Sequence, residues 1–252
     1  MVPWSLVIPV EVVPILAGGD NVCEAMVASG EPKRLVLAGS LAASGPSAPD
    51  RPRVEADPFC PEEFYGQSKA EAERIAFSYA DRFQVTAARP SRILGPGDRE
   101  NLVFFKMVKK GLRLKIGGGP RPLSMVDVDD VVELLLLLAE RPEAVGEAFF
   151  AAGVTTTLEA MQDTIAGHLG VSVRTLSISP PLLRGLGQAA DFASRLTGRH
   201  LPLNRKLARQ LLAPAWTCST EKAERLLGYR PAMGIDDSLK RSAAWYQQRG
   251  WI

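Results

Sequence analysis

The sequence predicts an α/β protein in which a parallel β-sheet carries the candidate site and a smaller, mostly helical part follows. Two short apolar runs without alternation, residues 34–38 and 84–89, are typical of parallel strands that are covered on both faces. A helical pattern from residue 65 to about residue 83 lies between them, as in a strand–helix–strand crossover. After residue 153, apolar residues recur mostly at helical spacing.

Further elements of the sheet part follow from local patterns. Residues 18–30 predict a helix that ends at Gly30. Residues 124–127 and 146–151 predict strands, and between them Asp127 or Asp129 caps a helix that ends near residue 140. Its five consecutive leucines, 134–138, are too few to cross a membrane and predict a helix buried on most sides.

The second part is expected to contain one exposed strand, residues 112–116, and several helices. Thr156 and Glu159 form a capping box that starts a helix reaching residue 169. The remaining predicted helices cover residues 181–196, 203–212, 220–227 and 235–249. The apolar residues of the first of these either line a substrate pocket or, as is more common at helical spacing, form plain core; they are Leu182, Leu183, Leu186, Phe192 and Leu196.

The composition is that of a soluble globular protein. Of 252 residues, 46% are hydrophobic and 23% are charged, and 30 basic against 28 acidic residues give a net charge of +2. This near balance gives no electrostatic case for nucleic acid. Three cysteines are too few for a disulfide framework or a zinc site, so we expect a reducing compartment, the cytoplasm.

Residues 2–17 are apolar enough to raise the question of export or a membrane anchor. They lack a basic start, and Pro3, Pro9 and Pro14 interrupt any helix that could span a bilayer. We therefore expect neither a signal peptide nor a membrane span. The segment is interpreted as an extended replacement strand or as sequence from outside the ancestral reading frame.

The candidate site combines Ser40, Tyr65 and Lys69. Tyr65 and Lys69 are spaced to share one face of a helix, so the ammonium group is expected to lower the pKa of the phenol. Ser40 follows the strand at residues 34–38, and ligands of open α/β sheets lie beyond such strand ends. The structural alternatives are a half-buried tyrosine beside a solvated lysine and a serine that only caps the strand end.

The motifs around these residues resemble the extended short-chain dehydrogenases/reductases, the NAD-dependent epimerase/dehydratase group that includes 3β-hydroxysteroid dehydrogenase-like reductases. The similarity rests on the order and spacing of Gly-Ser-Leu-Ala-Ala-Ser-Gly at Ser40, Tyr-Gly-Gln-Ser-Lys at Tyr65, Arg-Pro with Gly-Pro-Gly at residues 89–97, and Val-Asp-Val-Asp-Asp at residues 126–130. It covers roughly residues 18–150, with a weaker extension to the end of the chain.

The resemblance implies hydride transfer between a small-molecule substrate and NAD or NADP. In this reading Tyr65 exchanges the proton of the substrate hydroxyl or carbonyl, and Ser40 orients that oxygen. Lys69 depresses the tyrosine pKa and holds the nicotinamide ribose, and Pro90 also contacts the cofactor. The resemblance also allows a homodimer through the Tyr65 helix.

Three further residues are candidate substrate contacts: Arg99, Asn101 and Arg121. Solvated surface positions are the alternative for each. The carboxylates at positions 127, 129 and 130 could suggest a metal site, but helix capping explains them better. No metal is expected.

The chain also departs from the family pattern. No Gly-x-x-Gly-x-x-Gly turn precedes Ser40, and Ile15 occupies a position where the family has asparagine. We therefore expect an N-terminally truncated or rearranged member. Residues 1–95 and 124–152 would form a partial Rossmann-like NAD(P)-binding domain, and residues 96–123 and 153–252 the substrate-binding part. A catalytically silent binding or assembly module is the alternative function.

Overall fold

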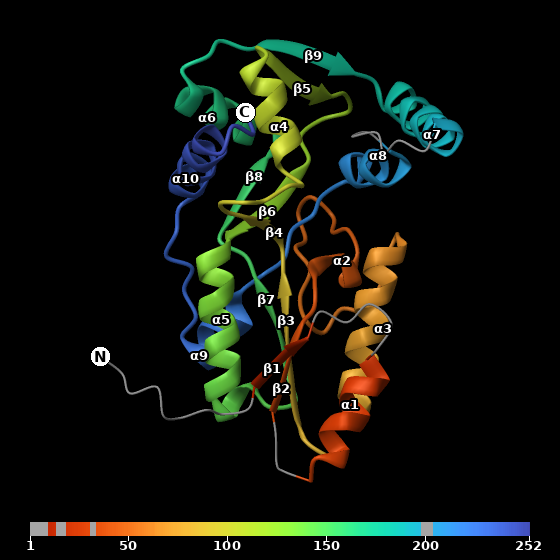
Figure 1. The fold of residues 1–252 in the computed structure, drawn as a ribbon, viewed down its shortest axis with the longest axis vertical. Helices are drawn as coiled ribbons and strands as arrows, with labels where there is room; N and C mark the ends of the chain where they lie inside the picture. The colour runs from red at the N-terminus through yellow and green to blue at the C-terminus, as the bar shows by residue number, and fades with distance from the viewer. Residues whose placement is uncertain (1–9, 14–18, 31–33, 198–203) are drawn as a thin grey trace.

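The computed structural model describes residues 10–13, 19–30, 34–197 and 204–252 (Figure 1). Most of the apolar segment at residues 2–17, including Ile15, lies outside these ranges, as does Leu203 at the start of one predicted helix. Among the described residues, no helix combines the length and the apolar character that a membrane span requires.

The sheet that carries the site is parallel throughout and has the order β1-β2-β3-β7. Its strands are β1 (Val10–Val13), β2 (Arg34–Ala38), β3 (Gln84–Pro90) and β7 (Ala148–Ala151). The register pairs Arg34 with Gln84 and Ala38 with Ala88, so β2 and β3 end at the same edge. The two strands predicted from apolar runs are thus confirmed as neighbours in a parallel sheet.

Helices cover both faces of this sheet (Figure 1). On one face α1 (Gly19–Ala28) and α3 (Phe64–Ser78) pack on alternate residues of β2 and β3. On the other face lie α5 (Val128–Glu140) and α9 (Glu221–Leu227). Burial on both faces explains why the strand sequences are continuously apolar.

The second part of the molecule has its own core (Figure 1). It contains a sheet of β4 (Arg92–Leu94), β6 (Pro122–Asp127) and β8 (Val154–Thr157), and a parallel pair of β5 (Leu112–Ile116) and β9 (Arg174–Ile178). Its core is built mainly by α4 (Leu102–Lys109), α6 (Leu158–Leu169) and α10 (Ile235–Gln248). The helices α7 (Pro180–Thr197) and α8 (Arg205–Leu212) lie to one side of this second part. Two further short elements are α2 (Leu41–Ser44) and the 3-10 turn Pro142–Ala144.

Several local predictions need correction. The N-cap of α6 is Thr157, whose hydroxyl accepts from the amide of Ala160, whereas Thr156 belongs to β8. The leucine-rich α5 is buried on one side only, because Leu134 and Leu138 are in the core while Leu136 is 57% exposed. The helix α3 ends at Ser78, five residues before the predicted end at Phe83.

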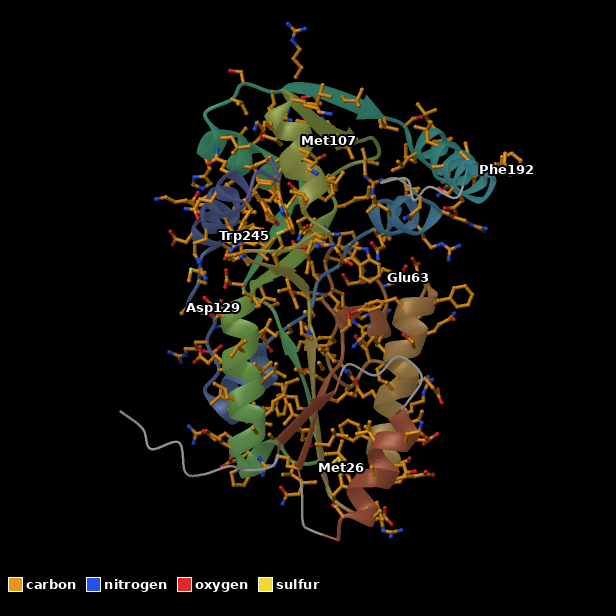
Figure 2. The ribbon with its side chains drawn as sticks, viewed as in Figure 1. Met26, Glu63, Met107, Asp129, Phe192 and Trp245 are labelled. Carbon is orange, nitrogen blue, oxygen red and sulfur yellow. The ribbon has the colours of Figure 1, made fainter. Side chains whose placement is uncertain are left out.

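The helix α7 was predicted to be core or pocket lining, and for four of its five named residues this was wrong. Only Leu183 is buried; the exposed residues are Leu182, Leu186, Phe192 and Leu196. Figure 2 shows Phe192 on the outer side of the helix. The periodicity was read correctly as a helix, but the buried stripe and the exposed stripe cannot be distinguished when apolar residues occupy both.

Candidate active site

The edge at which β2 and β3 end forms the floor of the candidate site. Gly39 follows β2, and its amide donates to the carbonyl of Ala88 at 2.7 Å. A Cβ added at Gly39 would lie 2.8 Å from the same oxygen, so only glycine fits this close approach. Ser40 comes next and caps α2 by accepting a hydrogen bond from the amide of Ala42 at 3.1 Å.

Close packing of α3 on α2 brings Tyr65 to Ser40. A Cβ added at Gly66 would lie 2.4 Å from the carbonyl oxygen of Ala42, so the glycine is what allows the helices to approach. The side chains of Tyr65 and Ser40 are hydrogen-bonded. The hydroxyl of Ser40 therefore caps the start of α2, rather than the strand end, and also lies beside the phenol of Tyr65.

Lys69 points back toward the strand end from the second turn of α3. Its side chain is buried, and Nζ donates to the carbonyl oxygen of Ala38 at 2.8 Å. The same Nζ lies 5.9 Å from the centroid of the Tyr65 ring. Burial lowers the pKa of Lys69 because removal from water disfavours the charged form.

The pKa of Tyr65 moves in the direction opposite to the one expected from the sequence. Burial raises the pKa of the phenol, the hydrogen bond from Ser40 opposes this, and the charges of Glu100 and Glu63 raise it further. Lys69 does not offset these effects. In this structure Tyr65 is accordingly a neutral phenol at neutral pH, which is the form that donates a proton.

A buried ion pair fixes α3 on the sheet. Both oxygens of Glu73 accept from the guanidinium of Arg89 on β3, with the Arg89 Nη2 to Glu73 Oε1 distance at 2.6 Å and the Arg89 Nε to Glu73 Oε2 distance at 3.0 Å. Both side chains are almost fully buried. Such bidentate geometry sets the orientation of the helix that carries Tyr65 and Lys69.

A cavity of about 510 Å³ opens above these groups, between the sheet and the second part of the molecule. Ser40, Tyr65 and Pro90 line it from the sheet side, and α4, α6 and α8 contribute residues from the other side. Figure 2 shows Glu63 at the end of α3 that faces α8, where its Oε1 accepts from Gln210 Nε2 at 2.5 Å. Chain segments distant in sequence therefore share one site.

The three predicted substrate contacts are placed differently. Asn101 and Arg121 line the cavity, whereas Arg99 lies with its guanidinium 5.3 Å from the Trp251 ring and is not part of the lining. The amide of Asn101 donates to the Ile93 carbonyl at 3.2 Å. The guanidinium of Arg121 donates to backbone carbonyls of residues 116, 117 and 119.

Sequence reasoning missed several charged and aromatic residues of the cavity: Arg92, Glu100, Glu159 and Trp216. One signal was available for Arg92, because it follows directly after the strand that ends at Pro90. The other three come from loops and helices whose proximity depends on the tertiary fold.

The acidic residues around the start of α5 act structurally, as expected. Asp127 caps the helix by accepting from the amide of Asp129 at 2.9 Å, and Asp130 accepts from the amides of Ala232 and Met233. Within the described ranges, no group of histidine, cysteine or acidic side chains is arranged to hold a metal ion.

The parallel sheet covered on two faces, with Ser40, Tyr65 and Lys69 at its strand ends, defines a Rossmann-type member of the extended short-chain dehydrogenases/reductases. The model of the NAD dependent epimerase/dehydratase family matches residues 1–152, and the chain belongs to that family. The family is NAD-dependent, and solved structural neighbours include complexes with NAD and with NADPH.

Relatives of different activity resemble the chain to a similar degree. It is 28% identical over 241 residues to a UDP-glucose 4-epimerase of Vibrio cholerae, covering 92% of this chain and 68% of the relative. It is 26% identical over 207 residues to a decarboxylating sterol-4-alpha-carboxylate 3-dehydrogenase of Saccharomyces cerevisiae, covering 76% and 58%. The chain thus spans 58% of the length of the yeast relative.

Among solved structures, the dTDP-glucose 4,6-dehydratase of Bacillus anthracis in complex with NAD superposes with a TM-score of 0.72. The match covers 96% of this chain and 73% of that chain at 17% sequence identity. At this identity the likeness establishes the fold alone, and the fold class predicted from the sequence is confirmed.

The residues at the strand ends fit the nicotinamide end of a dinucleotide. Lys69 is a buried cation that donates to the carbonyl oxygen of Ala38, and an ammonium group has further N–H donors that suit ribose hydroxyls. Pro90 and Tyr65 line the cavity, whereas Lys69 is not among its lining residues. The described residues before β2 include no Gly-x-x-Gly-x-x-Gly turn, so we assign no residue to the pyrophosphate.

Proposed function

We propose that the chain carries out NAD(P)-dependent hydride transfer at a hydroxyl or carbonyl carbon of a small-molecule substrate, using Ser40, Tyr65 and Lys69. The observation that carries the proposal is the hydrogen bond between Tyr65 and Ser40, which both line the cavity, with the buried Lys69 Nζ 5.9 Å from the centroid of the Tyr65 ring. A tyrosine that served only for core packing would require neither the hydrogen bond with Ser40 nor the nearby Lys69.

The chemistry follows from the proton donors. When bound, the reduced nicotinamide supplies the hydride that the carbonyl carbon accepts. Tyr65 donates its phenolic proton to the carbonyl oxygen, and Ser40 holds that oxygen by a hydrogen bond. Lys69 binds the ribose hydroxyls. In the oxidation direction the phenolate of Tyr65, which forms as the pH approaches its raised pKa, would take up the hydroxyl proton, and the oxidised nicotinamide would accept the hydride.

The proposal also covers the division of the chain into two parts, its location and its oligomeric state. The sheet part, residues 1–95 and 124–152, would bind the cofactor, and residues 96–123 and 153–252 would bind the substrate. A cytoplasmic location and a homodimer through α3 complete the proposal. Phe64, the first residue of α3, is 88% exposed and supports a contact at that helix.

The test is oxidation of NADH and NADPH by the purified chain with a panel of ketones and aldehydes, followed at the nicotinamide absorbance. Tyr65→Phe is expected to lower turnover by at least about 100-fold, because general acid catalysis contributes on the order of 10²–10⁴. The variant should keep the thermal midpoint of the wild type. Arg174→Gln, a change on the exposed β9, serves as the control.

Unchanged turnover in Tyr65→Phe would remove Tyr65 from the reaction. A folded wild-type chain that turns over no member of the panel and binds neither nucleotide would favour the second candidate, a silent binding or assembly module.

A further inference from the structure

The cavity contains a guanidinium group that the proposed hydride transfer does not use. Arg92, the first residue of β4, lines the cavity, and its Nη1 donates to Oδ1 of Asn101 at 2.5 Å. The guanidinium lies 5.9 Å from the centroid of the Phe104 ring. Among the residues that the structure describes, no carboxylate oxygen comes within 4.0 Å of it.

The nearby carboxylates do not serve as its partners. Asp98 and Glu100 attract the guanidinium at longer range, while burial lowers the pKa of Arg92. The carboxylate of Asp98 instead accepts from the Glu100 amide at 2.8 Å and from Asn101 Nδ2 at 2.5 Å. Arg92 is partly exposed at the cavity, and a guanidinium without a direct carboxylate partner among the described residues would form charge-assisted hydrogen bonds with a bound anion.

The remaining lining restricts the kind of anion. The second cavity arginine, Arg121, is engaged by backbone carbonyls. Three carboxylates line the cavity against two guanidinium groups, and they are Asp98, Glu100 and Glu159. The excess of carboxylates repels every negative charge on a ligand, so a single carboxylate paired with Arg92 is opposed less than a diphosphate, which carries at least two charges.

The rest of the wall is largely apolar. Its buried side chains come from β4, α4, β5, β6 and α6 and are Leu94, Phe104, Ile116, Met125 and Leu158. A wall of this kind favours an apolar ligand body with a small number of polar groups.

We propose that the cavity binds an apolar hydroxy- or oxo-carboxylic acid whose carboxylate pairs with Arg92 while its hydroxyl or carbonyl group lies at Tyr65 and Ser40. The proposal deepens the proposed hydride-transfer function and rests on it for the reacting group. The proposed recognition of the carboxylate by Arg92 depends only on the lining of the cavity and not on hydride transfer.

The probe pair is octanoate and octan-1-ol, which differ in the charged head group, measured by titration calorimetry against the wild-type chain without nucleotide. The acid is expected to bind at least about tenfold more tightly than the alcohol, because its carboxylate forms charge-assisted hydrogen bonds with Arg92 that the neutral hydroxyl cannot match. Arg92→Gln should bind acid and alcohol equally. Arg92→Lys keeps the charge and should retain part of the preference, and Arg174→Gln should keep all of it.

Equal binding of the two probes by the wild type, or an undiminished preference for the acid in folded Arg92→Gln, would overturn the assignment. So would tighter binding of UDP-glucose than of octanoate that depends on Arg92, since this would assign the guanidinium to a diphosphate. Tyr65→Phe separates the two proposals, because it should abolish turnover and leave the acid preference intact. If Arg92→Gln loses the preference for the acid while the wild type shows no turnover, the carboxylate assignment to Arg92 is supported and the hydride-transfer proposal is not.

Discussion

Tyr65 is held as a neutral phenol by the structure itself. Burial and the charges of Glu100 and Glu63 raise its pKa, and the Ser40 hydroxyl opposes them. A raised pKa keeps the proton on the phenol until the pH exceeds that pKa. Proton donation to a carbonyl is therefore available throughout the neutral range and is lost only as the pH rises through the pKa of Tyr65.

This predicts the titration of Tyr65 in the chain without cofactor. The difference in tyrosinate absorbance between the wild type and Tyr65→Phe should have its midpoint above 10.0, the usual value for tyrosine. A midpoint below 10.0 would mean that Lys69 dominates over burial, as the spacing of the two residues alone had suggested. Thermal midpoints of both proteins control for unfolding at high pH.

The site residues that could be predicted from the sequence are those with a local signature. Tyr65 and Lys69 are related by helical spacing, and Ser40 by its position after an apolar strand. The sign of the Tyr65 pKa shift could not be predicted, because it depends on burial by segments distant in sequence. Arg92 was missed because its position in the cavity depends on the tertiary structure.

At the scale of elements, the contact between α2 and α3 positions the site. Gly66 makes this contact possible, since a Cβ there would lie 2.4 Å from the Ala42 carbonyl. Gly66→Ala should therefore destabilise the chain by about 1–3 kcal/mol through overpacking and weaken the activity that depends on Tyr65. The measurement is chemical denaturation together with the nicotinamide assay.

Gly185 is the matched control for this substitution. It lies in α7, and a Cβ there would have no neighbour within 4 Å. Gly185→Ala should stabilise the chain by about 0.5–1 kcal/mol because alanine favours the helix. Equal effects at the two positions would show that the contact between α2 and α3 does not require glycine.

The ion pair between Glu73 and Arg89 fixes α3 against β3. Glu73→Ala leaves a buried guanidinium without its partner and should cost about 3–5 kcal/mol of unfolding free energy. Replacing both residues by methionine should cost less than the single change, because no charge then stays buried. A loss of only about 1 kcal/mol or less in Glu73→Ala would place the pair with ordinary surface ion pairs.

The fold elements that could be predicted are those whose own residue pattern indicates whether they are buried. The strand β2 has the predicted bounds, 34–38, because it is covered on both faces and reads as a continuous apolar run. The strand β9 was missed because most of its residues are exposed and it pairs only with β5. Thr156 and Thr157 are adjacent hydroxyl residues, and only the end of β8 decides which one caps α6.

At the scale of the whole molecule, the cavity joins two parts that have separate cores. Tyr65 and Lys69 come from a helix packed on the sheet, and the second part supplies most of the apolar wall and Arg92. A ligand that contacts both sides would stabilise the folded chain in proportion to its affinity. Cofactor binding is thus the central requirement of the account.

The most direct test is a titration of the purified chain with NADH and NADPH, followed by nicotinamide fluorescence and thermal shift together. We expect saturable binding of at least one nucleotide by the wild type and a rise in the thermal midpoint. Binding should be weakened about tenfold or more in Lys69→Ala, which removes the charged group proposed to hold the ribose hydroxyls. A folded wild-type chain that binds neither nucleotide, or Lys69→Ala that binds as tightly as the wild type, would contradict the proposed function.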